Sequence, residues 1–201
     1  MRNLFEEGLL RYLTVEQLGK IQRTKIGIAG VGGLGSNIAH ALVRTGFVDF
    51  EIVDIDYIDA SNLNRQNYYY DEVGQSKVEV TAKRLQQINP DVQVKLAQIK
   101  LNKENIKEYF SDSDILFEAF DKVESKILLL ESFGNSGKLL ISGNGMSGVV
   151  GEVIKVRQLS ENLYLVGDGV TEVGQDNPPL APRVIACASL MASVAVERVL
   201  L

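Results

Sequence analysis

Residues 25–35 read Lys-Ile-Gly-Ile-Ala-Gly-Val-Gly-Gly-Leu-Gly, an apolar stretch that runs directly into four closely spaced glycines. The first part, Lys25–Ala29, predicts a short buried strand, and apolar residues at helical spacing after the glycines predict a helix. Gly30, Gly32 and Gly35 therefore form a Gly-x-Gly-x-x-Gly turn between a strand and a helix. This arrangement is typical of parallel sheets that hold the phosphates of a nucleotide at the helix start.

Strands and helices alternate along the chain up to residue 143. Further strands are predicted at 50–54, 92–97, 114–118 and 138–142, and further helices from residue 76 to Asn89-Pro90, at 102–110 and at 124–133. This alternation predicts a Rossmann-like α/β fold, in which a mainly parallel sheet carries helices on both faces.

The pattern changes after residue 143. Strands are predicted at 149–156 and 163–166 with no helix between them, so we expect an antiparallel pair. A loop at 171–182 holds three of the four prolines, and 183–201 predicts a strongly apolar C-terminal helix that must be buried on most sides. Residues 1–201 are long enough for one domain and short for two. The expected parts of this single domain are an N-terminal helical segment (1–24), a nucleotide-binding part (25–143), and an antiparallel extension with the C-terminal helix (144–201).

The composition excludes several classes of protein. Lys and Arg number 21 against 26 Asp and Glu, and this net charge of −5 argues against a nucleic-acid partner, which usually meets a basic face. The single cysteine, Cys187, and the single histidine, His40, exclude a Cys/His zinc cage, so no zinc is expected. The N-terminus lacks the apolar core of a signal peptide, and no uncharged apolar run reaches the ~20 residues that span a bilayer. We therefore expect a cytoplasmic protein with no membrane partner.

Polar residues follow the predicted strands. Asp54 closes the second strand, where a carboxylate can accept hydrogen bonds from ribose hydroxyls. Arg65 and Lys77 lie in or beside polar segments expected above the carboxyl ends of the strands, where doubly wound sheets bind ligands. The glycine turn with Asp54 does not separate NAD from ATP, but two cations suit a triphosphate better than a dinucleotide. Asp121, at the end of the fourth strand, is placed to hold Mg²⁺ between phosphates.

These segments match the ubiquitin-activating-enzyme superfamily in order and approximate spacing, and the chain resembles its short ThiF branch, the sulfur carrier protein ThiS adenylyltransferases. The segments that carry the resemblance are Gly30-Val31-Gly32-Gly33-Leu34-Gly35, Asp54-Ile55-Asp56, Ser61-Asn62-Leu63-Asn64-Arg65-Gln66, Gly74 with Lys77, and Asn89-Pro90. Similarity to the ThiF branch extends to Glu118-Ala119-Phe120-Asp121, Gly167-Asp168 and Ala181-Pro182-Arg183-Val184.

The resemblance implies an ATP-dependent adenylyltransferase of thiamine biosynthesis. Such an enzyme joins AMP from ATP·Mg to the C-terminal glycine carboxylate of a ubiquitin-like sulfur carrier of the ThiS type. The implied nucleotide site contains Gly30, Gly32, Gly33 and Gly35 at the phosphate turn, Asp54 at the ribose, Ser61, Asn62 and Arg65 near the phosphates, Lys77 bridging them, and Asp121 on Mg²⁺. The resemblance also implies a homodimer, in which Arg11 of one protomer reaches the phosphates of the partner.

Two other functions remain open from the sequence. A tRNA-modifying dehydratase of the same superfamily adenylates a small carboxylate on RNA, but the negative net charge and the lack of a basic stripe count against it. A NAD-binding redox sensor or short dehydrogenase fits the glycine turn and Asp54, but leaves Arg65, Lys77 and Asp121 unexplained. Cys187 lies in an apolar helix and is expected to be a buried, inert thiol.

Overall fold

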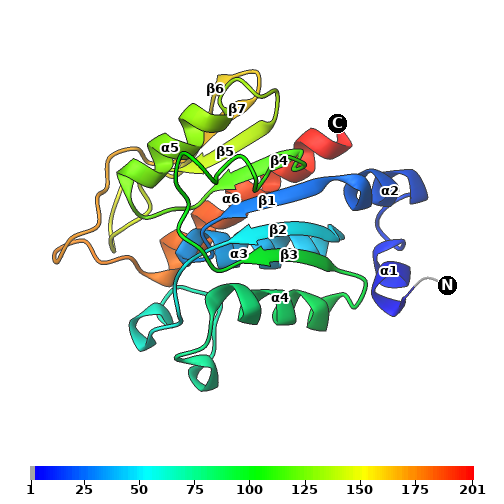
Figure 1. The fold of residues 1–201 in the computed structure, drawn as a ribbon, viewed down its shortest axis with the longest axis horizontal. Helices are drawn as coiled ribbons and strands as arrows, with labels where there is room; N and C mark the ends of the chain where they lie inside the picture. Colours follow the sequence, from blue (N-terminus) through cyan, green and yellow to red (C-terminus); the bar gives the residue numbers. More distant parts are fainter. Residues whose placement is uncertain (1–2) are drawn as a thin grey trace.

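The computed structural model describes residues 3–201, which form a seven-stranded sheet flanked by helices (Figure 1). The strands are β1 (Lys25–Ala29), β2 (Asp49–Val53), β3 (Gln93–Ala97), β4 (Ile115–Glu118), β5 (Leu139–Gly143), β6 (Lys155–Ser160) and β7 (Leu163–Gly167). The helices are α1 (Leu4–Leu9), α2 (Val15–Arg23), α3 (Gly33–Thr45), α4 (Lys77–Ile88), α5 (Val123–Phe133) and α6 (Ala181–Leu200), with 3₁₀ turns at Ala60–Asn62 and Tyr70–Glu72.

The order of the strands is β3-β2-β1-β4-β5-β7-β6. Neighbouring strands are parallel except β6 and β7, which form the predicted antiparallel pair at one edge. Ala29 at the end of β1 pairs with Val53 of β2 and with Glu118 of β4, so these three carboxyl ends lie together. The chain leaves β1 toward β2 on one side and returns to β4 on the other, and doubly wound sheets bind ligands at such a point. The predicted Rossmann-like fold is therefore confirmed.

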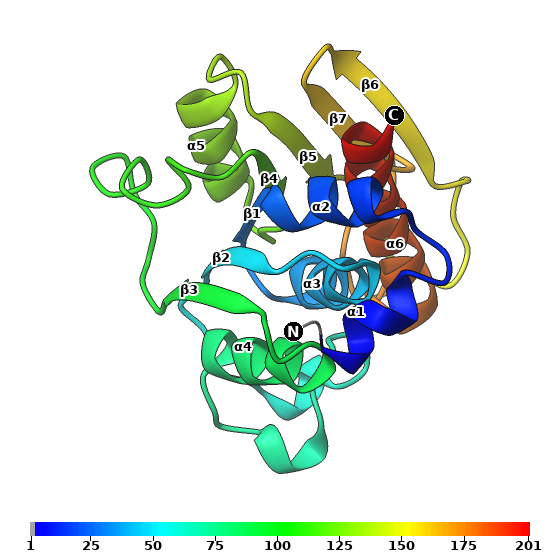
Figure 2. The ribbon, with the colours of Figure 1, turned by 90° about the vertical axis from the view of Figure 1, so that its right-hand side faces the viewer.

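The strand side chains alternate between two apolar layers, as the pleat of a sheet requires. Ile26 and Ile28 of β1 belong to a core shared with α3, α4 and α6. Leu116 of β4 and Leu140 of β5 face the other side, where they pack with Leu129 of α5. Figure 2 shows α5 on one side of the sheet and α3 and α6 on the other. Because both faces are covered, the central strands are apolar along almost their whole length.

Helix α3 begins directly at the glycine turn. Gly30 has a φ of +92°, in the left-handed region that favours glycine. A Cβ atom on Gly35 would overlap the carbonyl oxygen of Gly30, so α3 can approach the end of β1 this closely only with glycine at that position. The first and third glycines of the predicted turn thus have separate steric roles, one in the turn and one in the packing.

The C-terminal helix α6 packs against α3, α2, β5 and β7, as its apolar sequence predicts. Its buried residues are Val184, Cys187, Ala188, Met191, Ala192, Val194 and Ala195. Part of its apolar surface remains uncovered within the chain, because Ile185 is 43% exposed.

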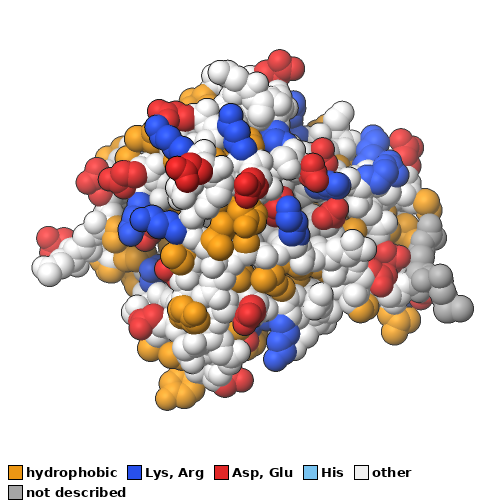
Figure 3. Space-filling view, in the orientation of Figure 1, with side chains coloured by type: hydrophobic (Ala, Val, Ile, Leu, Met, Phe, Trp, Pro, Cys, Tyr) orange, Lys and Arg blue, Asp and Glu red, His pale blue; other side chains and the backbone are white. Residues whose placement is uncertain are grey.

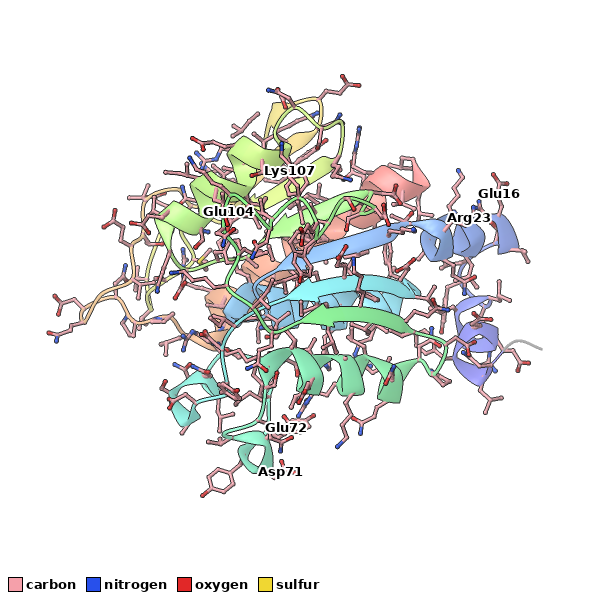
Figure 4. The ribbon with its side chains drawn as sticks, viewed as in Figure 1. Glu16, Arg23, Asp71, Glu72, Glu104 and Lys107 are labelled. Carbon is pink, nitrogen blue, oxygen red and sulfur yellow. The ribbon has the colours of Figure 1, made fainter. Side chains whose placement is uncertain are left out.

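The predicted helix at 102–110 is wrong. The segment forms successive turns, because the side-chain oxygen of Asn102 accepts hydrogen bonds from the backbone N–H groups of Glu104 and Asn105. Asparagine side chains compete in this way with helical hydrogen bonds. The segment crosses in front of the sheet in Figure 1, and Figure 4 labels Glu104 and Lys107 on it. Its buried Ile106 still covers the face on which α5 packs.

The predicted strand at 149–156 is also wrong over most of its length, because β6 begins only at Lys155. The preceding residues form a loop in which Gly145 and Gly148 have positive φ angles. The guanidinium of Arg183 donates to the carbonyl oxygens of Ser147 and Glu152, at 3.1 Å each, and so fixes the course of this loop. The other predicted helices and strands agree with the observed ones to within two residues.

Within residues 3–201, every helix is too short or too polar to cross a membrane.

The contact between α3 and β1 generates a prediction about stability. Gly35→Ala places a methyl group against the Gly30 carbonyl and should lower the free energy of unfolding by about 2–3 kcal/mol. Gly8→Ala is the matched control, because a Cβ on Gly8 meets no atom of residues 3–201 within 4 Å, and this substitution should raise the stability by about 0.5 kcal/mol. Urea unfolding followed by circular dichroism measures both values. Equal stability of Gly35→Ala and the wild type would contradict the proposed close contact.

Candidate functional site

The amino end of α3 is open toward the surface. Its N-cap is Gly32, no side chain in the described part of the chain caps the helix, and its first turn contains no acidic residue. A Cβ on Gly32 would meet only the side-chain nitrogen of Gln66, at 3.7 Å, so there is space above the turn. The first N–H groups of a helix have no partner inside it, and together with the helix dipole they favour a bound anion. The turn therefore fits a phosphate group.

Asp54 fastens the glycine turn to the end of β2. Its Oδ2 accepts a hydrogen bond from the N–H of Val31 at 2.7 Å, and its Oδ1 accepts one from the N–H of Asp56 at 2.9 Å. Burial raises the pKa of the Asp54 carboxyl, and these hydrogen bonds and the nearby Lys77 partly oppose the rise. The carboxylate is half-buried and keeps further lone pairs, so it can also accept bonds from ribose hydroxyls.

The polar segment around Arg65 lies across the first turn of α3. The Asn37 side chain donates to the carbonyl oxygens of Gly33, at 2.6 Å, and of Arg65, at 2.9 Å. The hydroxyl of Ser36 accepts from the N–H of Asn67 at 3.0 Å. Through Ser36 and Asn37, α3 therefore holds the segment around Arg65 beside its own amino end.

The guanidinium of Arg65 is oriented by its own segment. Its Nη1 donates to the carbonyl oxygen of Ser61 at 3.1 Å and to Oδ1 of Asn64 at 2.8 Å. The Arg65 Cγ and Cδ atoms lie 3.7 Å from where a Cβ on Gly33 would stand, so the side chain crosses the start of α3. Partial burial lowers the pKa of Arg65, and the negative charge of Asp121 acts in the opposite direction. The structure thus brings Arg65, Gly33 and Asp121 into one neighbourhood.

Lys77 is the first residue of α4, and its side chain is only 6% exposed. Its Nζ forms an ion pair with Oδ2 of Asp56 at 2.9 Å, and its backbone N–H donates to the Asp56 carbonyl oxygen at 3.1 Å. A buried ammonium requires a counter-ion, and Asp56 supplies it. The sequence did not predict this ion pair, because it joins residues that lie 21 positions apart.

Ser61 and Asn62 form a 3₁₀ turn beside Arg65. The Asp59 carboxylate accepts from the N–H of Ser61 at 2.8 Å, and Oδ1 of Asn62 accepts from the N–H of Asp59 at 3.0 Å. The oxygen of the Asn62 amide is thus used within the turn. Its NH₂ group has no hydrogen-bond partner in the part of the chain that the structure describes, which leaves a donor for a ligand.

Asp121 lies on the turn between β4 and α5. It is exposed, and it makes no hydrogen bond to any residue in 3–201. Across those residues, no three His, Cys, Asp or Glu side chains are grouped closely enough to hold a metal ion. Mg²⁺ is often held by one or two carboxylates together with substrate phosphates. The exposed carboxylate of Asp121, near the glycine turn that fits a phosphate, suits a magnesium site of that kind.

Arg11 is not brought to the other candidate residues. It is exposed and lies between α1 and α2, which precede β1, whereas the glycine turn follows β1. Figure 1 shows α1 and α2 at the end of the molecule opposite the segments that follow β2, and Figure 4 labels Glu16 and Arg23 on α2 there. Arg11 therefore has no part in the site of its own chain.

Neither His40 nor Cys187 is suited to acid–base or nucleophilic chemistry. Burial, reinforced by the charges of Arg44 and Arg84, lowers the pKa of His40 to about 4, so the ring is neutral at pH 7. Burial raises the pKa of the Cys187 thiol to about 12, and its Sγ donates weakly to the Val166 carbonyl oxygen. The expectation of a buried thiol is confirmed.

Tyr68 holds the backbone of the glycine turn by a hydrogen bond, a role that the sequence did not indicate. Its hydroxyl donates to the carbonyl oxygen of Val31 at 2.7 Å and lies 3.1 Å from the hydroxyl of Thr81 on α4. Burial raises the pKa of Tyr68 well above its ordinary value, so it remains a neutral phenol. The run Tyr68-Tyr69-Tyr70 gave no sign of this, because Tyr70 in the same run is 85% exposed.

Arg183 and Asp168 organise the loops beyond β5 and β7. Their ion pair measures 2.6 Å, and the Asp168 carboxylate also accepts from the N–H groups of Val170 and Thr171. Burial acts to raise the pKa of Asp168, but hydrogen bonds from Thr171 and Val170 and the Arg183 charge outweigh it, and the pKa lies below its usual value. Arg183 and Asp168, which lie in two of the segments similar to the ThiF branch, are thus bound to each other and to nearby backbone groups.

The fold and the glycine turn at the switch point define a doubly wound α/β protein of the nucleotide-binding class. More particularly, the chain belongs to the ThiF family, which matches residues 7–200.

Two curated relatives and one solved structure illustrate the similarity. The sulfur carrier protein adenylyltransferase of Thermus thermophilus is 32% identical over 139 residues, covering 66% of this chain and 51% of that protein. The sulfur carrier protein ThiS adenylyltransferase of Bacillus subtilis is 34% identical over 121 residues, covering 59% and 36%. The chain thus spans about half or less of these relatives. The ATP complex of the tRNA N6-threonylcarbamoyladenosine dehydratase of Escherichia coli superposes with a TM-score of 0.85 at 25% identity, covering 96% and 92% of the two chains.

The burial of Cys187 generates a prediction about pH. The thiol has a pKa of about 12 in the folded chain against an ordinary value of 9.0, so above pH 9 the unfolded chain loses a proton that the folded chain retains. The stability of the wild type should therefore fall faster than that of Cys187→Ala, by up to about 1.4 kcal/mol per pH unit. Urea unfolding of both proteins between pH 8 and 10.5 measures the difference. Parallel pH profiles would contradict the assigned burial of the thiol.

Proposed function

We propose that this chain is an ATP-dependent adenylyltransferase that activates the C-terminal glycine carboxylate of a ubiquitin-like sulfur carrier of the ThiS type, in thiamine biosynthesis. The observation that carries the proposal is the position of Arg65, which crosses the open amino end of α3 within the electrostatic reach of Asp121. Two cations, Arg65 and the Lys77 that begins α4, suit the charge of a triphosphate better than that of a dinucleotide. The relatives named as sulfur carrier adenylyltransferases support the choice of acceptor.

The reaction suits a site that has no general base. A C-terminal carboxylate has a pKa near ~3.5 and is already an ionised nucleophile at pH 7. Its oxygen attacks the α-phosphorus of ATP, forming the acyl–phosphate bond, and the bond to the leaving pyrophosphate breaks. No proton needs to be removed, so a chain whose one histidine is a buried neutral ring can perform this step. The main barrier is the approach of an anion to a polyanion.

In the proposed complex the site residues lower that barrier by neutralising charge. The N–H groups at Gly33 lie under the phosphates, and Arg65 and Lys77 bind phosphate oxygens on either side. Asp54 accepts hydrogen bonds from the ribose. Mg²⁺ held by Asp121 would neutralise part of the phosphate charge.

The ion pair of Lys77 with Asp56 prepares the lysine for this role. The side chain of Asp56 is 60% exposed, whereas that of Lys77 is 6% exposed, so Asp56 can rotate toward water when a phosphate replaces it. Until then it compensates the buried ammonium. The pair therefore keeps the Lys77 ammonium in place at the edge of the site when no ligand is bound.

A second candidate is a tRNA-modifying dehydratase that adenylates a carboxylate on RNA. The observation that favours it is the match to the Escherichia coli dehydratase over nearly the full length of both chains. The net charge of −5 counts against it. On the face seen in Figure 3, acidic and basic side chains are interspersed, and an RNA-binding face is usually basic. ATP–pyrophosphate exchange that needs a carrier ending in Gly-Gly, and does not respond to tRNA, distinguishes the first proposal.

The proposed assembly is a homodimer in which Arg11 completes the partner's phosphate site. Arg11 lies between α1 and α2, and Figure 1 shows these helices at the end of the molecule opposite the segments that follow β2, which supports supply across an interface. The uncovered side of α6, with Ile185 exposed, offers apolar surface for a subunit contact.

The proposed phosphate role of Arg65 generates a prediction about activity. Arg65→Ala should lower carrier-dependent ATP–pyrophosphate exchange by at least about 100-fold, on the scale of ~3 kcal/mol for one charge-stabilising group. The fold should survive, because among residues 3–201 the guanidinium is bound only by the exposed Ser61 and Asn64.

Arg44→Ala is the matched control, because Arg44 is an exposed arginine in the last turn of the same helix α3. It should exchange at close to the wild-type rate. If Arg65→Ala also exchanges at that rate with a normal circular dichroism spectrum, Arg65 does not belong to the site.

The proposed dimer generates a complementation prediction. Arg11→Ala and Asp121→Ala should each be inactive alone, but a mixture should recover part of the exchange activity, because one of the two mixed sites contains both native residues. Subunit exchange is verified first by native mass spectrometry with one isotopically labelled protomer. A monomer by light scattering at micromolar concentration, or no recovery after verified exchange, would disprove the contribution of Arg11 across the interface.

A further inference from the structure

A buried polar cluster lies at the carboxyl ends of β4 and β5, next to the proposed site. The Glu118 carboxylate accepts from the N–H of Phe120 at 2.8 Å and from the hydroxyl of Ser142 at 2.6 Å. The ammonium of Lys126, on α5, donates to both Glu118 oxygens, at 2.9 and 3.1 Å. It also donates to the carbonyl oxygen of Gly143 at 3.1 Å. The cluster thus joins β4, β5 and the first turns of α5.

Every charge in this cluster is compensated within it. Glu118 is 1% exposed and Ser142 is 4% exposed, so neither is solvated. The side chain of Lys126 is 24% exposed, and its donors are directed at Glu118 and Gly143. A buried ion pair contributes little to stability compared with apolar residues of similar size, because desolvation offsets its attraction. Packing alone therefore gives no reason for a charged pair at this place.

The cluster includes residues on both sides of Asp121 in the chain, with Glu118 before it and Lys126 after it. On one side, the N–H of Phe120 is bound to the Glu118 carboxylate. On the other side, Lys122 is the N-cap of α5, and the N–H of Lys126 bonds to the carbonyl oxygen of Lys122 at 3.2 Å. Asp121 itself makes no hydrogen bond to residues 3–201, so its carboxylate is placed entirely by the backbone that carries it.

We propose that Glu118 and Lys126 are positioning residues, which hold the turn from β4 to α5 so that the Asp121 carboxylate can bind Mg²⁺ between the phosphates. The inference rests on the proposed function, because Mg²⁺ is assigned as the ligand of Asp121 from that function. It adds two residues to the site that touch neither nucleotide nor metal. Their effect reaches the ligand only through the geometry of Asp121.

Calorimetric titration of the full chain with ATP, in excess Mg²⁺ and in EDTA, tests this. In the wild type, Mg²⁺ should strengthen ATP binding, and Asp121→Asn should remove most of that strengthening. Lys126→Met should reduce it by about 10-fold, the usual effect of losing a residue that orients a metal ligand. Lys126→Arg should restore most of it. In the Asp121→Asn background, Lys126→Met should cause no further loss, because both changes act through one carboxylate.

Lys138→Met is the matched control for lost stability. Lys138 donates to the backbone carbonyl oxygens of Ser111 and Ser113 at 2.7 Å, at the opposite end of β4, and its loss should leave the Mg²⁺ effect intact. Ser142→Ala is a milder change to the same cluster, for use if Lys126→Met does not fold, and should reduce the Mg²⁺ effect in the same direction.

The outcomes separate the two proposals. A wild type that does not bind ATP overturns the proposed function and this inference together. If Asp121→Asn loses the Mg²⁺ effect while folded Lys126→Met and Ser142→Ala retain it, the positioning role is wrong and the proposed function stands. Equal losses from Lys126→Met with and without Asp121 would also overturn the positioning role, because the cluster would then act by another route.

Discussion

The contact between Gly35 and the carbonyl oxygen of Gly30 is the constraint on which the candidate site depends. Only glycine at residue 35 allows α3 to start so close to the end of β1, and the start of α3 remains uncapped by any side chain. Other elements are arranged around that open helix end. Asp54 binds the turn from β2, and Tyr68 binds it from the side of α4. A movement of α3 would disturb each of these contacts.

The site is organised before any ligand arrives. Arg65 is oriented by Ser61 and Asn64, and Lys77 is held by Asp56, so both cations are already restrained. Groups held in this way need little rearrangement when charge develops, and that is the main source of electrostatic catalysis. The same reasoning applies to Asp121, whose carboxylate makes no hydrogen bond within residues 3–201 while the backbone beside it is bound by Glu118. A reaction whose nucleophile is already ionised needs these charges and no proton acceptor.

The sequence predicted the parts of the structure that depend on local patterns. The apolar runs and the glycine spacing gave the parallel strands, α3 and the turn at Gly30, because strand and helix periodicity are properties of neighbouring residues. The errors at 102–110 and 149–156 have a different origin. Asn102 satisfies the backbone locally, and Arg183 holds its loop from 36 residues away, and hydropathy patterns contain neither interaction. The pairing of Lys77 with Asp56 escaped prediction for the same reason.

The proposed reaction of this chain transfers AMP to the C-terminal carboxylate of a small carrier. Mass spectrometry of a ThiS-type carrier ending in Gly-Gly, incubated with the chain and ATP·Mg, tests that claim most directly. We expect a carrier heavier by one adenylyl group, formed with release of pyrophosphate and absent when the terminal glycine is deleted. An unmodified carrier in the presence of a folded chain that binds NAD in preference to ATP would contradict it.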